Sequence, residues 1–518
     1  MPVERRILVL DTTLRDGDQA AGFAFSAREK LKLGLALAEA GVDIVETGFP
    51  VSSRADFELC RRLAGELGAG RLTAVMCRGR LEDIRRSAEV FSGGLPGALH
   101  ISLPASAIHI GAKLGKTGKE VLALVRETVS FASGLVSRVE LGAEDASRAD
   151  PDFLADYCGT ALMAGAGTVN IADTLGILCP AGAAALTAFL LSRNPGFSGG
   201  AVLSIHCHND MGLACANTLA AVEAGCSQVE VSVSGIGERA GNAALEEVAA
   251  NLAMRRGSCR AYTGIDLAKV PALIGLAAGT LGAAVSPMKP LSGWNVRAHS
   301  AGTHQQGLSR ERKTYNVENF PIMAPERIVL SRHSGKAGAA LFCRRYLGLA
   351  PDGETLAELM ARIKNDAAFD SGAVGMSELL GLLGTMGKLP TAYEGPLLIS
   401  SWSGARSAGR ALFRAALRPA LAGEPVTETT GRGKTGTSAA LDALNRLWKI
   451  GTPEMPPDIR LLKRALNGAG SKIRLYAALK FGARLYRLER VGSDAELLLF
   501  QCGLDGINAE QFRRFPHS

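Results

Sequence analysis

Eight short β-rich runs recur through the first 260 residues, and this repetition constrains the fold more than any other feature of the sequence. Stretches rich in alanine and leucine with helical spacing separate most of the runs, as in SAREKLKLGLALAEAG. Strands that alternate with helices in this way predict a parallel (β/α)8 TIM barrel. A doubly wound open sheet is the alternative, and eight regular units favour closure. The runs occupy 7–11, 42–46, 72–76, 98–102, 137–141, 167–171, 202–206 and 229–233.

Polar and ionisable residues cluster at the ends of these runs or just after them. In a barrel the carboxyl ends of all the strands open at one mouth, where barrel enzymes carry their chemistry. Charges scattered over the surface would not fall at the carboxyl ends of the strands in this regular way, so the clustering predicts an enzyme active site. The residues are Arg15, Asp16, Glu46, Arg78, His109, Glu144, Asp173, Thr174, His206, His208, Glu238, Arg239 and Asn242.

The rhythm of the sequence changes beyond residue 280, where prolines and a polar stretch interrupt it. We expect a catalytic barrel over 1–275 and a helical connector over 276–390. A small α/β domain follows over 391–518, with a helix at 441–448 and strands at 473–481, 483–491 and 495–504. With 518 residues, 47% of them hydrophobic, the chain can bury a large core in two or three domains.

Bulk properties exclude several classes of protein. The apolar run near the N-terminus is short and soon interrupted by charge, so we expect no membrane span and a soluble cytoplasmic protein. Ten cysteines without a CxxC pair indicate reduced thiols. The net charge of +8 comes from 391–518, which holds 19 basic and 11 acidic residues (19 − 11 = 8). These charges are dispersed and no nucleic-acid motif accompanies them, which predicts a solvated surface.

The segment HCHND places His206 and His208 two residues apart, so both face one side of a strand. Two imidazoles on one face, joined by a carboxylate such as Asp16 from another strand end, form a site for a first-row metal. Paired histidines that only hydrogen-bond a core are the alternative. Cys207, between them, is expected to be a small core residue on the opposite face.

Two glycine-rich segments resemble phosphate cradles but lack the required spacing. GIGERAGN (235–242) does not follow the strand–GxGxxG–helix pattern, and a turn that places Asn242 beside the metal fits better. GRGKT (431–435) would need a glycine at 428 to form a P-loop, and that residue is Glu428.

Five segments together resemble the 2-isopropylmalate synthase and homocitrate synthase family, part of a wider group of metal-dependent aldolase-like barrels that includes hydroxymethylglutaryl-CoA lyase. The resemblance spans roughly 5–345, and the C-terminal region weakly resembles the leucine-sensing domain of isopropylmalate synthases, which favours that branch. The segments are DTTLRDGDQAAG (11–22), VETGFP (45–50), EDASR (144–148), HCHNDMGLACAN (206–217) and GIGERAGN (235–242).

The resemblance implies a divalent metal ion, Zn, Mn or Mg, held by Asp16, His206 and His208 with Asn242 completing or supporting the sphere. A 2-oxo acid would chelate this metal. Arg15 would stabilise the negative charge that develops on the keto oxygen.

Further roles follow from the same resemblance. Glu46 would hold Arg15 or a metal-bound water, and Thr174 would bind the carboxylate of the oxo acid. Either Glu144 or His304, alone or as a pair, would remove a methyl proton from acetyl-CoA. We also expect Arg78 and His109 to contact the substrate.

The expected activity is a Claisen-type condensation of acetyl-CoA with a 2-oxo acid by a homodimer. 2-Oxoisovalerate, giving 2-isopropylmalate for leucine biosynthesis, is the first expectation; homocitrate, citramalate or phosphonomethylmalate synthesis is the alternative. A retro-aldol lyase usually carries a glycine-flanked cysteine loop near the mouth, which this sequence lacks. An inactive paralogue is the third class, and the intact candidate residues speak against it.

Several positions depart from the family pattern. HSAGTHQQG lacks two acidic residues, at Ser300 and Gln306, and Phe320 replaces a tyrosine. Asp18 replaces a glutamate, and two changes near the expected oxo-acid pocket, at Ser102 and Ala105, bear on the exact substrate. The effector loop reads GKTGTSAA (433–440), so leucine inhibition is expected to be lost or altered.

Overall fold

The structure is a computed structural model that describes residues 4–281, 285–293, 295–315, 326–365, 374, 379, 382–383 and 385–388, together with the backbone of six strands between 397 and 492. The chain divides into two compact units. The first comprises Met1–Arg297 and Val317–Glu326, and the second comprises Ala298–Asn316 and Arg327–Ser518.

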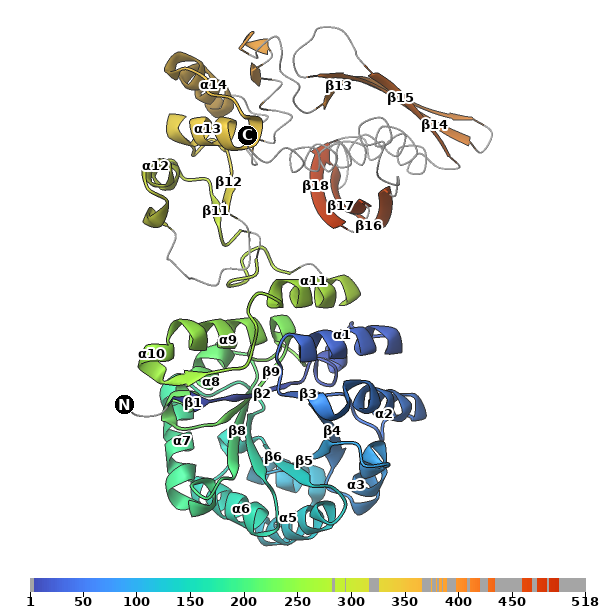
Figure 1. Cartoon of the computed structure of the whole chain (residues 1–518), viewed down its shortest axis with the longest axis vertical. Coiled ribbons are helices and arrows are strands. Elements are labelled where there is room, and N and C mark those ends of the chain that lie inside the picture. The colour runs from blue at the N-terminus through green and yellow to red at the C-terminus, as the bar shows by residue number, and fades with distance from the viewer. Residues whose placement is uncertain are drawn as a thin grey trace. The chain divides into compact units, whose positions relative to one another are not determined.

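Eight strands of the first unit form a closed barrel in which every pairing is parallel, and β2 pairs with β9 to close it (Figure 1). The predicted barrel is therefore confirmed, and the open-sheet alternative is wrong. The strands are β2 (Leu8–Asp11), β3 (Ile44–Glu46), β4 (Leu72–Arg78), β5 (Gly97–Pro104), β6 (Arg138–Glu144), β7 (Thr168–Asp173), β8 (Val202–Cys207) and β9 (Gln228–Val231).

Helices surround the barrel, and the longer ones bury their apolar faces against it (Figure 1). They are α1 (Ala27–Glu39), α2 (Arg54–Leu67), α3 (Leu81–Ala88), α4 (Ala107–His109), α5 (Gly118–Ser133), α6 (Pro151–Met163), α7 (Pro180–Arg193), α8 (Ala214–Ala224), α9 (Leu245–Met254), α10 (Arg256–Cys259) and α11 (Val270–Leu281). A short parallel pair, β1 (Arg5–Arg6) with β10 (Ala261–Tyr262), lies outside the ring of strands.

Local sequence signals start several of these helices. Ser26 and Thr117 each cap a helix and form a capping box with the glutamate three residues later. Asp150 accepts a hydrogen bond from the backbone of Phe153, and Pro151 occupies the first helical position. Buried leucines at helical spacing, such as Leu33 and Leu37 of α1, then fix the face turned to the strands.

The interior of the barrel is apolar at one end and polar above it. Leu10, Ile44, Ala74 and Ala98 form a small cluster separate from the core between strands and helices. Because side chains alternate along a strand, the residue two positions after Ala98, His100, shares its face. Glu140, Asn170, Ser204, Gln228 and Glu230 are likewise buried and contact one another across the barrel. Polar groups therefore fill the space beneath the mouth.

The second unit contains mainly helices in its first part. They are α12 (Gly302–Arg310), α13 (Lys336–Phe342) and α14 (Gly353–Asn365), and β11 (Ala298–His299) pairs in parallel with β12 (Arg327–Ile328). The core includes Leu308, Phe342 and Leu359. The unit boundary after Arg297 differs from the expected limit at 275, and the expected domain limits stay predictions.

Two antiparallel three-stranded sheets follow. One contains β13 (Leu397–Ser407), β14 (Arg410–Pro419) and β15 (Thr427–Gly433), and the other contains β16 (Ile459–Asn467), β17 (Ile473–Phe481) and β18 (Arg484–Gly492). The strands expected at 473–481 and 483–491 match β17 and β18. The helix expected at 441–448 and the strand at 495–504 lie outside the described residues. Within the described part of the chain, none of the helices has the length and apolar character of a membrane span.

Candidate active site

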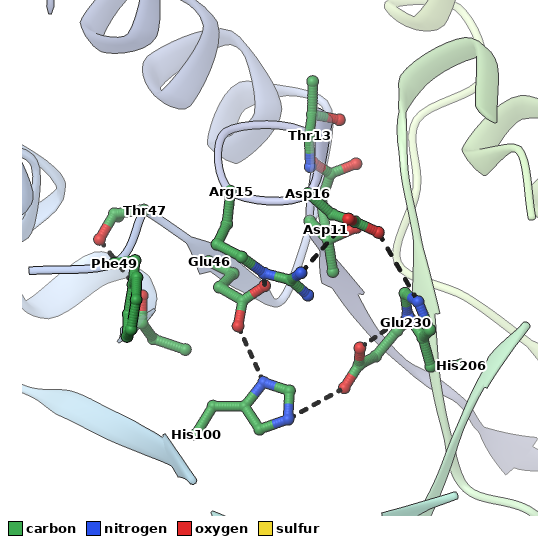
Figure 2. A network of polar contacts seen from close by, with 12 residues as sticks. Asp11, Thr13, Arg15, Asp16, Glu46, Thr47, Phe49, His100, His206 and Glu230 are labelled. Carbon is green, nitrogen blue, oxygen red and sulfur yellow. Dashed lines mark hydrogen bonds and ion pairs between the residues drawn. The ribbon is translucent and has the colours of Figure 1, made fainter. Parts of the chain in front are cut away.

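Three buried side chains converge at the mouth of the barrel: Asp16, from the turn after β2, and His206 and His208, at the end of β8 (Figure 2 shows the first two). The Nε2 atoms of the two histidines lie 3.2 Å apart, and Nε2 of His206 lies 3.7 Å from Oδ2 of Asp16. Cys207 is fully buried in the core between strands and helices, as expected from strand alternation. The HxH motif and the first strand end are therefore brought together as predicted.

Local backbone geometry holds both ends of this group. The carbonyl of Thr12 accepts hydrogen bonds from the backbone N–H groups of Arg15, Asp16 and Gly17, which turns the chain back over the strand end. His208 forms an isolated antiparallel bridge with Asn242. The loop before Asn242 needs glycine, because Gly241 has a φ of +88° and a Cβ there would collide with the carbonyl of Gly235.

Protonation states make this group a set of metal donors. Burial, together with the neighbouring His206, lowers the pKa of His208 to about 3, so this imidazole is neutral at pH 7. Burial would raise the pKa of Asp16, but Arg15 and the two histidines outweigh it and lower the pKa to about 2. Lone pairs and a carboxylate that face one point repel one another unless a cation lies between them. The donors fit a divalent metal ion.

Asn242 contacts the donor set from the loop after β9. Its Nδ2 donates a hydrogen bond to Oδ2 of Asp16 at 2.7 Å, and the side chain is buried. Its Oδ1 has no hydrogen-bond partner among the described residues. Asn242 therefore orients Asp16 and offers one more oxygen near the donors.

Arg15 is a buried cation between two carboxylates, one of them a metal donor (Figure 2). Its Nε donates to Oε2 of Glu46 at 2.7 Å, and its NH1 lies 3.4 Å from Oδ1 of Asp16. Burial would raise the pKa of Glu46, yet Arg15 and His100 lower it to about 2, so the partner stays ionised. A guanidinium fixed in this way is suited to stabilise negative charge that develops beside the donor set.

Other predicted residues gather around the ends of β6 and β7. Oε1 of Glu144 lies 3.4 Å from Nδ1 of His109 and also contacts the ammonium of Lys113. The hydroxyl of Thr174 accepts a hydrogen bond from the backbone N–H of Asp145 at 2.9 Å. Asp145 itself has a left-handed φ of +61° and pairs with Arg148. Glu144 and His109 are thus neighbours, and Thr174 fixes the loop beside them.

Two predicted residues have other surroundings. Arg78 ends β4, but its guanidinium is half-exposed and donates to Asp83 of α3 at 2.5 Å. His304 belongs to the second unit, where its ring stacks on Tyr315 with a centroid distance of 4.0 Å. Phe320, expected near this histidine, lies outside the described residues. Substrate contact by Arg78 and proton transfer by His304 stay predictions.

Three buried residues beneath the donor set were missed by sequence reasoning: His100, Glu140 and Glu230. Each lies inside a run that had been interpreted only as a strand. The signal that could have found them is an ionisable residue on the inward face of a strand within an otherwise apolar run. Such residues are rarely buried without a partner.

A cavity of about 380 Å³ opens beside Arg15. Its lining includes Asp18 and Lys30, and the buried ammonium of Lys30 lies 2.8 Å from Asp18 and 3.3 Å from Asp56. Phe25 and Phe49 supply apolar surface. The cavity provides space next to the cation of the site.

The HMGL-like family model matches residues 6–276, and the chain belongs to this family. Within it, the chain is similar to curated 2-isopropylmalate synthases, which confirms the resemblance noted in the sequence. The enzyme of Heliobacterium modesticaldum is 38% identical over 366 residues, 70% of each chain. That of Pyrococcus furiosus is 40% identical, covering 64% of this chain and 66% of the relative, and that of Solidesulfovibrio magneticus is 38% identical, covering 70% and 71%.

Among solved structures, a hydroxymethylglutaryl-CoA lyase from Pseudomonas aeruginosa covers 55% of this chain and 94% of its own, with 20% identity and a TM-score of 0.46.

Proposed function

We propose that this chain condenses acetyl-CoA with a 2-oxo acid, releases CoA, and takes 2-oxoisovalerate to give 2-isopropylmalate for leucine biosynthesis. The observation that carries the proposal is the buried donor set of Asp16, His206 and His208 with Arg15 fixed against it. The similarity to 2-isopropylmalate synthases supports the choice of substrates. A homodimer and a place in the cytoplasm are parts of the proposal that only the family supports.

Asp16, His206 and His208 would hold a divalent ion, which would supply Lewis-acid polarisation of the keto group of the oxo acid. Arg15 stabilises the negative charge that the keto oxygen gains as the reaction proceeds. Because Glu46 binds Nε of Arg15, the terminal nitrogens are oriented before the substrate arrives. This preorganisation removes a cost that a mobile arginine would add to the barrier.

The bond changes of the reaction balance without a further co-reactant besides water. A base takes one methyl proton from acetyl-CoA, and the freed electron pair forms the new carbon–carbon bond to the keto carbon. The keto oxygen receives the carbonyl electron pair and then a proton. Water attacks the thioester carbonyl, and CoA leaves as the thiol.

Two residues are candidates for the base, Glu144 of β6 and His304 of α12. Exchange of the acetyl-CoA methyl protons into D2O, measured with a non-reacting oxo-acid analogue, distinguishes Glu144→Gln from His304→Gln. The variant that loses exchange by about 10²-fold or more carries the base. Loss in both variants would indicate that the two act as a pair.

The experiment that tests the function follows CoA release with a thiol reagent. Purified, metal-loaded protein is given acetyl-CoA with oxoisovalerate, oxoglutarate, pyruvate or phosphonopyruvate. We expect metal-dependent release that is fastest with oxoisovalerate. Faster release with another acid would assign the homocitrate, citramalate or phosphonomethylmalate alternative. No release across the panel from protein that holds metal would overturn the proposed condensation.

A further inference from the structure

A layer of polar side chains beneath the donor set connects His206, a metal donor, with Arg15, which lies beside the donor set (Figure 2). Glu230 of β9 contacts His206, and His100 of β5 contacts Glu46, the partner of Arg15. We propose that Glu230 and His100 are a positioning pair that orients His206 for metal binding and Arg15 for charge stabilisation. The inference rests on the proposed function for its catalytic part and on the donor set alone for its metal-binding part.

Glu230 acts on the far side of the His206 ring. Its Oε2 lies 2.9 Å from Nδ1 of His206, and its Oε1 accepts a hydrogen bond from Nδ2 of Asn170 at 2.5 Å. The pair does not meet the geometry of a hydrogen bond, but a negative charge this close to Nδ1 favours the tautomer that carries the proton there. The lone pair then lies on Nε2, which faces Asp16 and His208. Asn170 in turn limits the freedom of the Glu230 carboxylate.

His100 connects this carboxylate to the arginine. Its Nδ1 lies 2.8 Å from Oε1 of Glu46, and its Nε2 lies 3.9 Å from Oε1 of Glu230. Burial alone would lower the pKa of His100, but Glu230, Glu46 and Glu140 raise it to about 9. An imidazolium in this place holds two buried carboxylates that would otherwise repel each other. Glu46 thus remains in contact with Arg15, and Glu230 remains in contact with His206.

His100, Glu140 and Glu230 also approach closely enough to suggest a second metal site. Their surroundings favour a closed network instead. A protonated imidazole offers no lone pair to a metal, and Oε1 of Glu140 accepts a hydrogen bond from Gln228 at 2.9 Å. Burial raises the pKa of Glu140 to about 8, so this carboxyl is mostly neutral at pH 7. The charges of the layer are thus compensated without an ion.

Metal affinity of the apo-protein tests the inference independently of activity. Calorimetric titration with Mn²⁺ or Zn²⁺ is compared for the wild type, Glu230→Gln and Glu140→Gln. We expect Glu230→Gln to weaken metal binding by about 10- to 100-fold. Glu140→Gln is the matched control, because it makes the same substitution in the same buried layer at a carboxyl without a contact to His206 or Arg15 among those described. It should bind metal as the wild type does.

A second pair of measurements addresses folding and Arg15. Should Glu230→Gln unfold, Asn170→Ala removes the anchor of the same carboxylate and should weaken metal binding in the same direction but less. His100→Gln should lower kcat at saturating metal while KM for acetyl-CoA and metal affinity stay unchanged, as expected of a residue that acts through Arg15.

Three results would overturn the positioning role. These are wild-type affinity in Glu230→Gln, an equal loss in Glu140→Gln, or two ions bound per wild-type chain. A wild-type protein that binds no metal would instead overturn the proposed function, so the two failures are distinguishable.

Discussion

Two layers of the barrel interior contain the same kinds of residue in different states. The donor layer is Asp16, His206 and His208, and the network layer is His100, Glu140 and Glu230. All six side chains are buried, and within each layer the potential ligand atoms approach within 4.8 Å. Proximity and residue type therefore do not separate a metal site from a structural network.

Protonation and partners do separate the two layers. In the donor layer His208 is neutral, Asp16 is ionised, and the two histidine Nε2 atoms lie 3.2 Å apart. In the network layer His100 is protonated and pairs with carboxylates, and Glu140 pairs with an amide. The donor layer therefore offers a neutral imidazole and a carboxylate to a cation, whereas the network layer is closed by its own charges and hydrogen bonds and can orient the donors.

The largest expected effect is the loss of a donor. Asp16→Asn keeps the shape of the side chain but removes the negative charge that attracts the cation. We expect metal affinity to fall by more than about 100-fold and CoA release to fall to background. Metal analysis and the thiol assay measure both. Asp152→Asn, on the outside of α6, is the control and should match the wild type. Full metal binding by Asp16→Asn would contradict the assignment of the donor layer.

The next effect concerns Arg15, the buried cation between Asp16 and Glu46. Arg15→Lys retains a positive charge for Glu46 but loses the planar guanidinium that reaches Glu46 and Asp16 together. We expect kcat to fall by about 10²- to 10³-fold with metal stoichiometry unchanged. Steady-state kinetics with metal analysis measure this separation. A variant that changes only the KM for the oxo acid would assign Arg15 to binding and not to charge stabilisation.

A smaller effect concerns stability and pH. His100 faces Glu46, Glu230 and Glu140, and its pKa rises in the folded protein from 6.5 to about 9. Because the raised pKa belongs to the folded state, its contribution is fully present below pH 6.5 and is lost as pH rises through 9. His100→Gln should therefore be less stable than the wild type at pH 6, with a smaller difference at pH 9. Urea unfolding midpoints of the metal-free proteins check this, and a constant difference would contradict it.

The smallest effect is expected at Glu140, which faces His100, Glu230, Glu46 and Gln228. Burial raises its folded pKa from 4.5 to about 8, so its contribution to stability is present below pH 4.5 and is lost as pH rises through 8. Glu140→Gln cannot ionise and should gain stability relative to the wild type between pH 6 and pH 9. The same urea series measures the gain. A constant difference over this range would show that Glu140 is already ionised in the fold at pH 6.

The barrel could be predicted because its periodicity is local. The run at 98–102 lies within β5, and the run at 202–206 covers most of β8. The donor layer was also predictable, since a strand places His206 and His208 on one face and parallel strands end at one mouth. The register of the closed barrel was not needed for either inference.

The contacts within the network layer could not be predicted, because they join residues across the barrel. The His100–Glu46 contact joins residues 54 positions apart, and the Gln228–Glu140 contact joins residues 88 positions apart. Which of these side chains meet depends on the stagger of the strands, which hydrophobic periodicity does not encode. The ion pair between Arg78 and Asp83 is local in sequence. The strand pattern alone does not decide whether the Arg78 guanidinium pairs with Asp83 or points into the mouth of the barrel.

Closure of the barrel between β2 and β9 has a consequence for how the protein holds together. Asp16 belongs to the first βα unit, whereas His206, His208 and Asn242 belong to the last two, so 190 positions separate Asp16 from His206 (206 − 16 = 190) and 226 separate it from Asn242. A cation bound by all of them would link the first βα unit of the barrel to the last two. Such a ligand, present at 1,000 times its Kd, stabilises the folded state by about 4 kcal/mol. Removal of the metal by a chelator would then lower the stability of the folded barrel as well as abolish its activity.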